Sequence, residues 1–414
     1  MAHLLMIEGW VSESGNLILP LLKQLGHTYS FVTRNPALYK SAHGSDLHPL
    51  FENAEDVTEV DTNNIPELIE AVKNRKFDGV ITVCDYYLEA VRSVAEALDV
   101  PCPVPDNLQN IRQKHLMRKA FNDAGVANAE FRLADSWEDT VECANQIGYP
   151  LIVKPVDLAS SAFVSLVRNE IELRNAYNAL SGFTVNFRHQ ERNTVILLEE
   201  FLIGEEVSVE SISFQGEISI IGITDKSVTG NPYFIETGHM FPAILSDDSH
   251  VELIAYIKES LKAVGFDNGI AHTEVKLTKA GPRIVEINPR TPGNYIVELI
   301  ERVTGINLLK VFLGLSLGEK PNLLCKETGI KSASVMFLVP PKEGTLAGIK
   351  GLETLAENPH LIRYNIPDFS GKHIETPTDN DCYLGHIMSF DKEGQNARKY
   401  VEHAINQVEL LYED

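Results

Sequence analysis

Residues 269–288 contain two β-patterned runs on either side of TKAGPR, a turn-forming stretch, and this pattern predicts a β-hairpin. If the hairpin is antiparallel and centred near Ala280, Glu274 lies directly opposite Glu286, because both are six positions from the centre. Opposed residues in such a pair have Cβ atoms about 4.5–5.5 Å apart. Two carboxylates at that separation repel each other, which indicates that a cation lies between them.

Asn288 adds an amide oxygen on the same face as Glu286, because strand side chains alternate with a period of two. The same alternation sends Val285 and Ile287 to a buried face. The alternative is a solvated strand face with ordinary charges, but Asn-Pro-Arg is a poor continuation of a strand. Mg²⁺ in proteins uses one or two carboxylates together with substrate phosphates. The hairpin therefore predicts a site for Mg²⁺, or for Mn²⁺ in its place, at Glu274, Glu286 and Asn288.

The first hundred residues alternate between short apolar runs and helical patterns. LLMIE (4–8), TYSFVT (28–33) and FDGVITVC (77–84) are predicted strands, and Pro20 must lie in the first turn of a helix or kink it. This alternation is typical of a parallel sheet with helices on both faces. PCPVP (101–105) is then a linker.

After the linker the pattern becomes α+β. A basic helix over 107–126 ends at a glycine, strands are expected near 149–156, 333–339 and 384–390, and a closing helix is expected over about 393–411. We therefore expect a protein of mixed α/β and α+β class in three parts. These are an N-terminal parallel α/β domain (1–105), a central domain of two subdomains divided near residue 190 (106–300), and an α+β segment that completes the site (301–414).

Composition excludes several functional classes. The 414 residues carry a formal net charge of −22, whereas proteins that bind nucleic acid usually present a basic surface. The mean hydropathy is −0.08, and no apolar run reaches the roughly 18 residues of a membrane span. The five cysteines have no C-x-x-C spacing, which argues against disulfides and structural zinc. With no basic leader at the N-terminus, we expect a cytoplasmic protein.

Three segments in order resemble the nucleotide site of the ATP-grasp superfamily: YPLIVKP, LLEEFLIGEEVSVE and VEINPR. The resemblance covers residues 106–300 well and implies an ATP-grasp fold with ATP as a substrate. The chain has no G-x-x-x-x-G-K-[ST] stretch, so a P-loop site does not compete with this interpretation.

The resemblance implies roles for particular residues. Lys114 and Lys154 would contact the phosphates, and the backbone of Glu200 and Leu202 would bind the edge of adenine in a hinge. Glu206 would accept hydrogen bonds from the ribose hydroxyls, although it and Glu205 could equally be turn acids. The full set implied for ATP is Lys114, Lys154, Ser160, Ser161, Glu199, Glu200, Phe201, Leu202 and Glu206.

The loop DLASSAFVS (157–165) departs from the family pattern. Ser160 and Ser161 are present, but the glycines that let a backbone approach phosphates closely are absent, and Phe163 is bulky. The departure puts in question how tightly this loop covers the phosphates.

The stretch NPYFIETGHMFPA (231–243) resembles the substrate segment of L-amino-acid ligases. The resemblance implies that Glu236 binds an ammonium group and that His239 orients the substrate or accepts a proton; the alternative for His239 is a purely structural contact with backbone. Arg290 would hold the acyl phosphate and the oxyanion, or else form a structural salt bridge. The residues implied for the substrate are Glu236, His239, Arg290, Gly293 and Asn294, with Arg290 and His239 also catalytic.

The expected function is an ATP-dependent carboxylate–amine ligase that joins two amino-acid-like substrates, similar to dipeptide ligases of bacilysin-type and related peptide-antibiotic pathways. An enzyme that activates bicarbonate or formate, like biotin carboxylase or purine-pathway relatives, is the second expectation. A non-catalytic ATP-binding regulator is the third. The expected partners are small molecules, with neither nucleic acid nor membrane, and a homodimer is left open.

Overall fold

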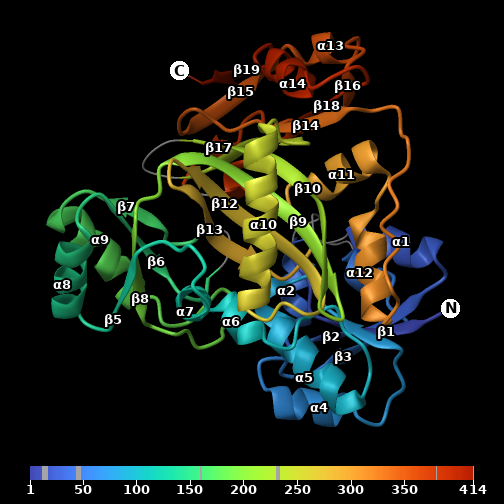
Figure 1. The fold of residues 1–414 in the computed structure, drawn as a ribbon. Coiled ribbons are helices and arrows are strands. Elements are labelled where there is room, and N and C mark those ends of the chain that lie inside the picture. Colours follow the sequence, from blue (N-terminus) through green and yellow to red (C-terminus); the bar gives the residue numbers. More distant parts are fainter. Residues whose placement is uncertain (12–16, 43–47, 159–160, 230–233, 379, 414) are drawn as a thin grey trace.

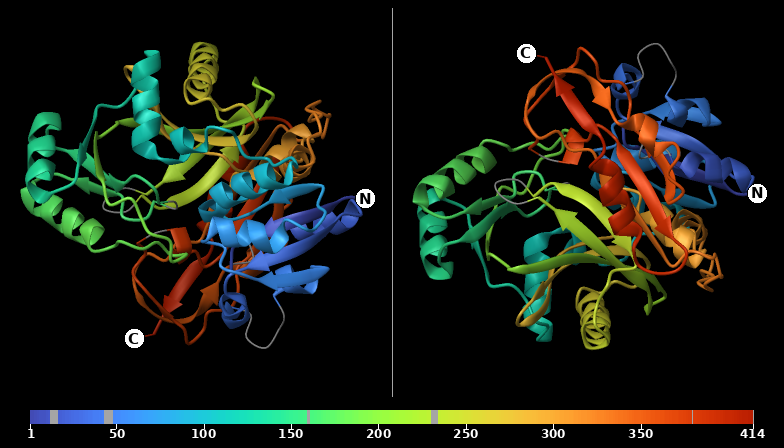
Figure 2. Two further views of the ribbon diagram at one scale, coloured as in Figure 1. Left: turned by 90° about the horizontal axis from the view of Figure 1, so that it is seen from below. Right: turned by 90° about the horizontal axis from the view of Figure 1, so that it is seen from above.

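A computed structural model describes residues 1–11, 17–42, 48–158, 161–229, 234–378 and 380–413 (Figure 1). The strands in these ranges form one parallel sheet and three antiparallel sheets, which confirms the predicted mixture of α/β and α+β structure. Figure 2 shows the four-stranded antiparallel sheet within residues 131–200, called the small sheet below, with its two helices at one side of the molecule. The parallel sheet lies at the other side. None of the described helices combines the length and apolar character needed to cross a bilayer.

The N-terminal strands form the predicted parallel sheet in the order β3-β2-β1-β4. Leu4 to Ile7 on β1 are fully buried because helices cover both faces. Strand β3 has no signal in the sequence, because this edge strand is mostly exposed and lacks an apolar pattern. Pro20 lies in the first turn of α1, as expected. The elements are β1 (His3–Ile7), α1 (Ile18–Gln24), β2 (Thr28–Thr33), α2 (Pro36–Ala42), α3 (Pro49–Glu52), β3 (Asp56–Glu59), α4 (Ile65–Val72), β4 (Gly79–Ile81), the short 3₁₀ helix η2 (Asp85–Tyr87) and α5 (Leu88–Leu98).

The helix expected over 107–126 is in fact two helices. The backbone is extended at Gln113, where the N–H of Lys114 donates to the carbonyl of Val156 at 2.9 Å, so the chain bonds to the small sheet instead of continuing the helix. The second helix ends at Gly125 in a left-handed conformation, as expected. The two helices are α6 (Leu108–Arg112) and α7 (Lys114–Ala124). The small sheet has the strand order β5-β8-β6-β7, and it and its own two helices comprise β5 (Phe131–Ala134), α8 (Trp137–Ile147), β6 (Leu151–Pro155), β7 (Ser165–Val167), α9 (Glu170–Ser181) and β8 (Ile196–Glu200).

The largest sheet runs in the order β13-β12-β9-β10-β11-β14-β18-β16, so strands from the last third of the chain extend the sheet that holds the hairpin. The closing helix is shorter than expected, because the chain leaves it to pair β19 with β15. The elements are β9 (Gly204–Phe214), β10 (Glu217–Val228), β11 (Glu236–Phe241), α10 (Asp247–Ala263), β12 (Gly269–Thr278), β13 (Gly281–Asn288), α11 (Ile296–Thr304), α12 (Leu308–Ser316), β14 (Ser332–Phe337), β15 (Gly344–Lys350), α13 (Leu352–Leu355), β16 (Leu361–Asn365), β17 (His373–Ile374), η3 (Asn380–Cys382), β18 (His386–Asp391), α14 (Ala397–Ile405) and β19 (Glu409–Tyr412).

The hairpin of β12 and β13 places Glu274 opposite Glu286, as predicted, but its turn is centred between Lys279 and Ala280 and not on Ala280, because Thr278 pairs with Gly281. A β-bulge interrupts the pairing, because Val275 pairs with Ile284 and Val285 is the extra residue. Ile284 and Ile287 therefore both face the core, whereas Val285 lines a cleft. The expectation that Val285 shares the buried face with Ile287 is wrong, because one extra residue reverses the alternation of a strand.

The packing between the N-terminal sheet and α12 can be tested by a substitution at Gly79, which lies against the end of α12. A Cβ at this position would lie 2.0 Å from the carbonyl oxygen of Ser316. We expect Gly79→Ala to lower the free energy of unfolding by about 1–3 kcal/mol, as for other overpacked sites, measured by urea unfolding. Gly182→Ala is the control, since its φ is −79° and the nearest atom is 3.4 Å away. Equal stability of the Gly79→Ala protein and the wild type would contradict this packing.

Candidate active site

A cleft lies between the small sheet and strands β9–β13, and most of the predicted site residues line it. Those that do so are Lys114, Lys154, Ser161, Glu199, Glu200, Phe201, Leu202, Glu206, Glu236, Glu274 and Glu286. The predicted residues outside this lining are Asn288, His239, Arg290, Gly293 and Asn294. Ser160 lies outside the described residues.

Glu274 and Glu286 face each other across the hairpin, and each is held by a lysine. Lys226 Nζ is 3.0 Å from Glu274 Oε1, and Lys114 Nζ is 3.0 Å from Glu286 Oε2. Burial raises the pKa of Glu286, but Lys114 and a hydrogen bond from Asn288 Nδ2 lower it to about 2. The carboxylate of Glu286 is therefore ionised at neutral pH.

Two carboxylates and an amide on one face form a donor set that suits Mg²⁺. In the described part of the chain, no three His, Cys, Asp or Glu side chains gather as a complete metal site. An ion on Glu274, Glu286 and Asn288 would therefore take its remaining ligands from elsewhere, as Mg²⁺ does when it bridges protein carboxylates and nucleotide phosphates.

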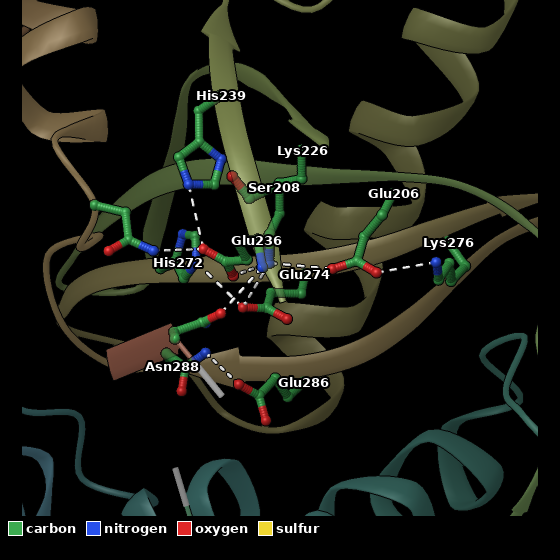
Figure 3. Close-up of polar contacts among 12 residues, drawn as sticks. Glu206, Ser208, Lys226, Glu236, His239, His272, Glu274, Lys276, Glu286 and Asn288 are labelled. Atoms are coloured by element: carbon green, nitrogen blue, oxygen red, sulfur yellow. Dashed lines mark hydrogen bonds and ion pairs between the residues drawn. The ribbon is translucent and has the colours of Figure 1, made fainter. Parts of the chain in front are cut away.

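Lys226 lines the cleft, and its ammonium group lies among the carboxylates of Glu206, Glu236 and Glu274 (Figure 3). It is 2.9 Å from Glu236, 3.0 Å from Glu274 and 3.1 Å from Glu206, and Glu206 also pairs with Lys276 at 3.0 Å. Burial lowers the pKa of Lys226, but the three carboxylates raise it well above the ordinary value. Burial raises the pKa of Glu236, but Lys226 holds it well below the ordinary value. Lys226 and Glu236 are therefore charged together.

Sequence reasoning missed Lys226. It lies on β10, where its register partners are Glu206 on β9 and His239 on β11. The available signal was a lysine in a largely apolar strand pattern, which is the argument that singled out Lys154.

Lys154 belongs to a second buried ion cluster. Its Nζ is 2.6 Å from Glu199, and Glu199 also accepts a hydrogen bond from Arg118 Nε at 2.7 Å. Burial raises the pKa of Glu199, but Arg118 and Lys154 lower it to about 2. Burial lowers the pKa of Lys154, and Glu199 opposes that effect. In the predicted hinge, the N–H of Glu200 donates to the carbonyl of Glu130, so it is engaged within the protein.

Glu236 is held from several sides at the start of β11. Asn294 Nδ2 donates to Glu236 Oε2 at 2.5 Å, and His239 Nε2 is 3.2 Å from the same oxygen. From the last part of the chain, the Tyr383 hydroxyl donates to the carbonyl of Glu236, and Asn380 Oδ1 accepts its N–H. The His239 side chain is fully buried, and within the described residues its ring nitrogens make no hydrogen bond, so its contact with Glu236 is one of distance only and its roles as substrate-orienting group and proton acceptor stay predictions.

Arg290 forms an ion pair with Asp85 of η2 at 2.8 Å and donates to the carbonyl of Thr291. Burial lowers the pKa of Arg290, but Asp85 raises it. The salt bridge that was the alternative interpretation of Arg290 is therefore present. Asp85 gave no sequence signal, because it is far from Arg290 in the chain. A Cβ at Gly293 would meet no atom within 4 Å, which agrees with the room expected there.

His272 lies behind Glu274 and was assigned no role from the sequence. Its Nδ1 is 3.0 Å from Glu210, its Nε2 is 3.5 Å from Glu274, and Ser208 donates to Glu210 at 2.7 Å (Figure 3). Burial lowers the pKa of His272, but Glu210 and Glu274 raise it to about 9. The imidazole is thus a buried cation that contacts both Glu210 and Glu274.

The loop without glycines takes backbone conformations that glycine would favour. Ser161 and Phe163 have φ values of 56° and 60°. Such left-handed conformations cost other residues roughly 1–2 kcal/mol each. The Phe163 ring packs against Phe183 with centroids 4.7 Å apart, which offsets part of that cost.

Comparison with known proteins identifies two parts of the chain. Residues 147–298 match the ATP-grasp domain family, and residues 336–413 match the family of L-amino acid ligase C-terminal domain 2. The second match covers the residues Asn380 and Tyr383 that hold Glu236.

Individual relatives are similar over different shares of the chain. An alanine–anticapsin ligase of Bacillus amyloliquefaciens is 28% identical over 65% of this chain and 60% of its own length. An L-arginine-specific L-amino acid ligase of Bacillus subtilis is 21% identical over 91% of this chain and 93% of its own. The crystal structure of an L-amino acid ligase from Bacillus licheniformis has a TM-score of 0.80, with 22% identity over 100% and 99% of the two chains. The chain therefore spans about 60% of the alanine–anticapsin ligase, and its fold is the ATP-grasp fold of the solved ligase.

Glu199→Gln tests the second ion cluster. We expect the free energy of unfolding near pH 7 to fall by about 3–5 kcal/mol, because two buried cations lose their carboxylate. The folded pKa of about 2 lies below the ordinary value of 4.5, so the stabilisation by Glu199 is complete above pH 4.5 and is lost as the pH falls toward 2. The stability difference between wild type and variant should therefore shrink over that interval in urea unfolding. A difference that stays constant as the pH falls would contradict the ion pairing of Glu199.

Proposed function

Because this chain is an ATP-grasp protein with the C-terminal domain of L-amino acid ligases, we propose that it is an ATP-dependent carboxylate–amine ligase. In the proposed reaction the carboxylate of one amino-acid-like substrate attacks the γ-phosphate of ATP and forms an acyl phosphate. The amine of a second substrate then displaces phosphate and forms an amide bond. A role in making a dipeptide or a peptide antibiotic is part of the proposal, since one relative is named as an alanine–anticapsin ligase.

The observation that carries the proposal is the environment of Glu236. Its ionised carboxylate lines the cleft, and the residues that hold its backbone, Asn380 and Tyr383, belong to the part of the chain that matches the amino acid ligases. A carboxylate in this position is matched in charge to the ammonium group of an amino acid. Asn294 donates to the same carboxylate and would fix its orientation toward the substrate.

The nucleotide is proposed to lie along the rest of the cleft. Lys114 and Lys154 line it and would offset the charge of a triphosphate as point charges. Glu206 would accept hydrogen bonds from the ribose diol, for which a carboxylate is a matched pair of acceptors. Strand β8 ends at Glu200, and the carbonyl of Glu200 together with the backbone of Leu202 would bind the adenine edge.

Glu274, Glu286 and Asn288 would hold Mg²⁺, which neutralises charge on the transferring phosphoryl group when it is bound. Arg290 remains charged throughout because Asp85 supports it. With a planar fork of donors it would stabilise the acyl phosphate and the oxyanion that forms when the amine attacks. These roles of the site residues are proposals.

A panel assay tests the reaction. ADP and phosphate release is measured with ATP and single amino acids, with pairs of amino acids, with bicarbonate, and with formate. The proposal expects turnover that needs an amino acid pair, together with a product whose mass equals the sum of both minus one water. Turnover that depends on bicarbonate or formate alone would replace the proposal with the second class of enzyme. Tight ATP binding without hydrolysis in any mixture would indicate a regulator.

Glu286→Ala removes one proposed metal ligand and leaves Lys114 without its partner. We expect turnover to fall below detection in the ADP-release assay, while the protein remains folded by circular dichroism. Turnover near the wild-type rate would contradict the assignment of Glu286.

Glu206→Ala and Glu205→Ala form a matched pair of adjacent acids. Glu206 lines the cleft between Lys226 and Lys276, whereas Glu205 is exposed. We expect Glu206→Ala to raise KM for ATP by about tenfold, the effect of about 1.4 kcal/mol of lost binding. Glu205→Ala should leave KM unchanged. Equal effects of the two variants would show that neither carboxylate has a specific role with ribose.

A further inference from the structure

Arg118 on α7 is fully buried and uses its guanidinium to join three parts of the fold. Nε donates to Glu199 at 2.7 Å and Nη2 to the same carboxylate at 3.3 Å. Nη1 donates to the carbonyl of Ile284 at 2.7 Å, and Nη2 to that of Val285 at 3.1 Å. Nη1 also reaches Asn128 Oδ1 at 3.2 Å. Arg118 thus contacts β8 and the bulge of β13, which belong to different sheets.

The two carbonyls that Arg118 binds belong to the β-bulge. A bulge disrupts the ladder locally, and buried backbone groups without partners are costly. Arg118 supplies donors to the carbonyls of Ile284 and Val285, and the hydroxyl of Tyr256 accepts the N–H of Ile284 at 3.0 Å. Three backbone polar groups at the bulge are therefore satisfied by side chains from two helices, α7 and α10.

The bulge determines where Glu286 points. On the Ala280 side of the bulge Val275 pairs with Ile284, and beyond it Glu274 pairs with Glu286. Without the extra residue the same register would continue, so Glu274 would lie opposite Val285 and Glu286 would move to the other face. The bonds from Arg118 therefore stabilise the conformation in which the two carboxylates share one face.

The same guanidinium acts on the phosphate side of the cleft. Glu199, which Arg118 holds through both oxygens, in turn holds Lys154 Nζ at 2.6 Å. A lysine could replace the charge of Arg118 but not its fork of donors, because one ammonium cannot span a carboxylate and two carbonyls in a fixed plane.

We propose that Arg118 is a positioning residue that sets Glu286 through the β13 bulge and Lys154 through Glu199, without touching nucleotide or substrate. The proposal rests on the proposed function, since it assumes that Glu286 and Lys154 serve metal and phosphate. It predicts that one buried side chain outside the cleft affects both the binding of the metal and the binding of the nucleotide phosphates.

The test measures Mn²⁺ binding in the presence of ADP by electron paramagnetic resonance, and ADP binding without metal by calorimetry, for the full chain. Arg118→Met and Arg118→Lys should each weaken Mn²⁺ binding by about 10–100-fold, the range seen when the partners of metal ligands are removed. Both should also weaken metal-free ADP binding. Glu199→Gln should weaken metal-free ADP binding but leave Mn²⁺ binding at saturating ADP unchanged, because the bonds from Arg118 to the bulge remain. Arg188→Lys is the control for loss of a buried guanidinium, since Arg188 bonds to Gly9 far from the bulge.

Thermal midpoints recorded on the same samples separate positioning from stability, and binding is measured well below those midpoints. If Arg118→Met does not fold, Arg118→Lys alone decides the outcome. A lowered midpoint with wild-type Mn²⁺ and ADP affinities would overturn the proposal, because it is the behaviour of a purely structural arginine. Glu286→Ala distinguishes a failure of this inference from a failure of the proposed metal site. Weak Mn²⁺ binding in Glu286→Ala with normal binding in the Arg118 variants rejects only this inference, whereas normal binding in Glu286→Ala rejects the proposed metal site itself.

Discussion

The ammonium group of Lys226 is the contact on which the arrangement of the cleft depends. Three carboxylates that come from β9, β11 and β12 lie within 2.9–3.1 Å of it. Carboxylates that share a buried site repel each other, and without a cation at least one would take up a proton. A buried lysine is equally unfavourable by itself, because desolvation favours its neutral form. Lys226 and the three carboxylates therefore stabilise one another. The pairing of the strands brings them together, and their mutual attraction in turn favours that pairing.

The same pairing recurs at every lysine that the proposed function directs toward phosphate. Lys114 is paired with Glu286 and Lys154 with Glu199, so the cations of the cleft already have carboxylate partners in the protein alone. A chain with a net charge of −22 can therefore offer a triphosphate a local group of cations. When nucleotide and metal bind, both lysines would contact phosphate oxygens, Glu286 would contact the metal in place of Lys114, and Glu199 would keep Arg118 as its partner. Such an exchange conserves the number of ion pairs, which keeps the cost of desolvation low.

Separate parts of the chain complete the site at both ends. The N-terminal α/β unit supplies Asp85 to Arg290, and the last part of the chain supplies Asn380 and Tyr383 to Glu236. The predicted division into three domains is a convenient description of the sequence. The strands after residue 301 nevertheless continue the sheet of the hairpin, and they join it at β11, the strand that begins with Glu236.

Local patterns in the sequence were sufficient for much of this protein. The alternation of strands and helices predicted the parallel sheet, because it depends on residues close together in the chain, whereas the predicted pairing of Glu274 with Glu286 holds only because of the bulge at Val285. The break at Gln113, the bulge at Val285 and the edge strand β3 escaped prediction. The first two are stabilised by partners distant in sequence, namely Val156 and Arg118, and the third has no apolar pattern. The roles of Lys226, His272 and Asp85 also escaped prediction, because each is defined by partners that lie on other strands or helices. The sequence by itself determined the mixed fold class and most of the strands and helices, whereas only the tertiary structure decided which acids and cations meet, because the bulge that sets Glu274 opposite Glu286 and the contacts of Lys226 depend on residues from different regions of the chain.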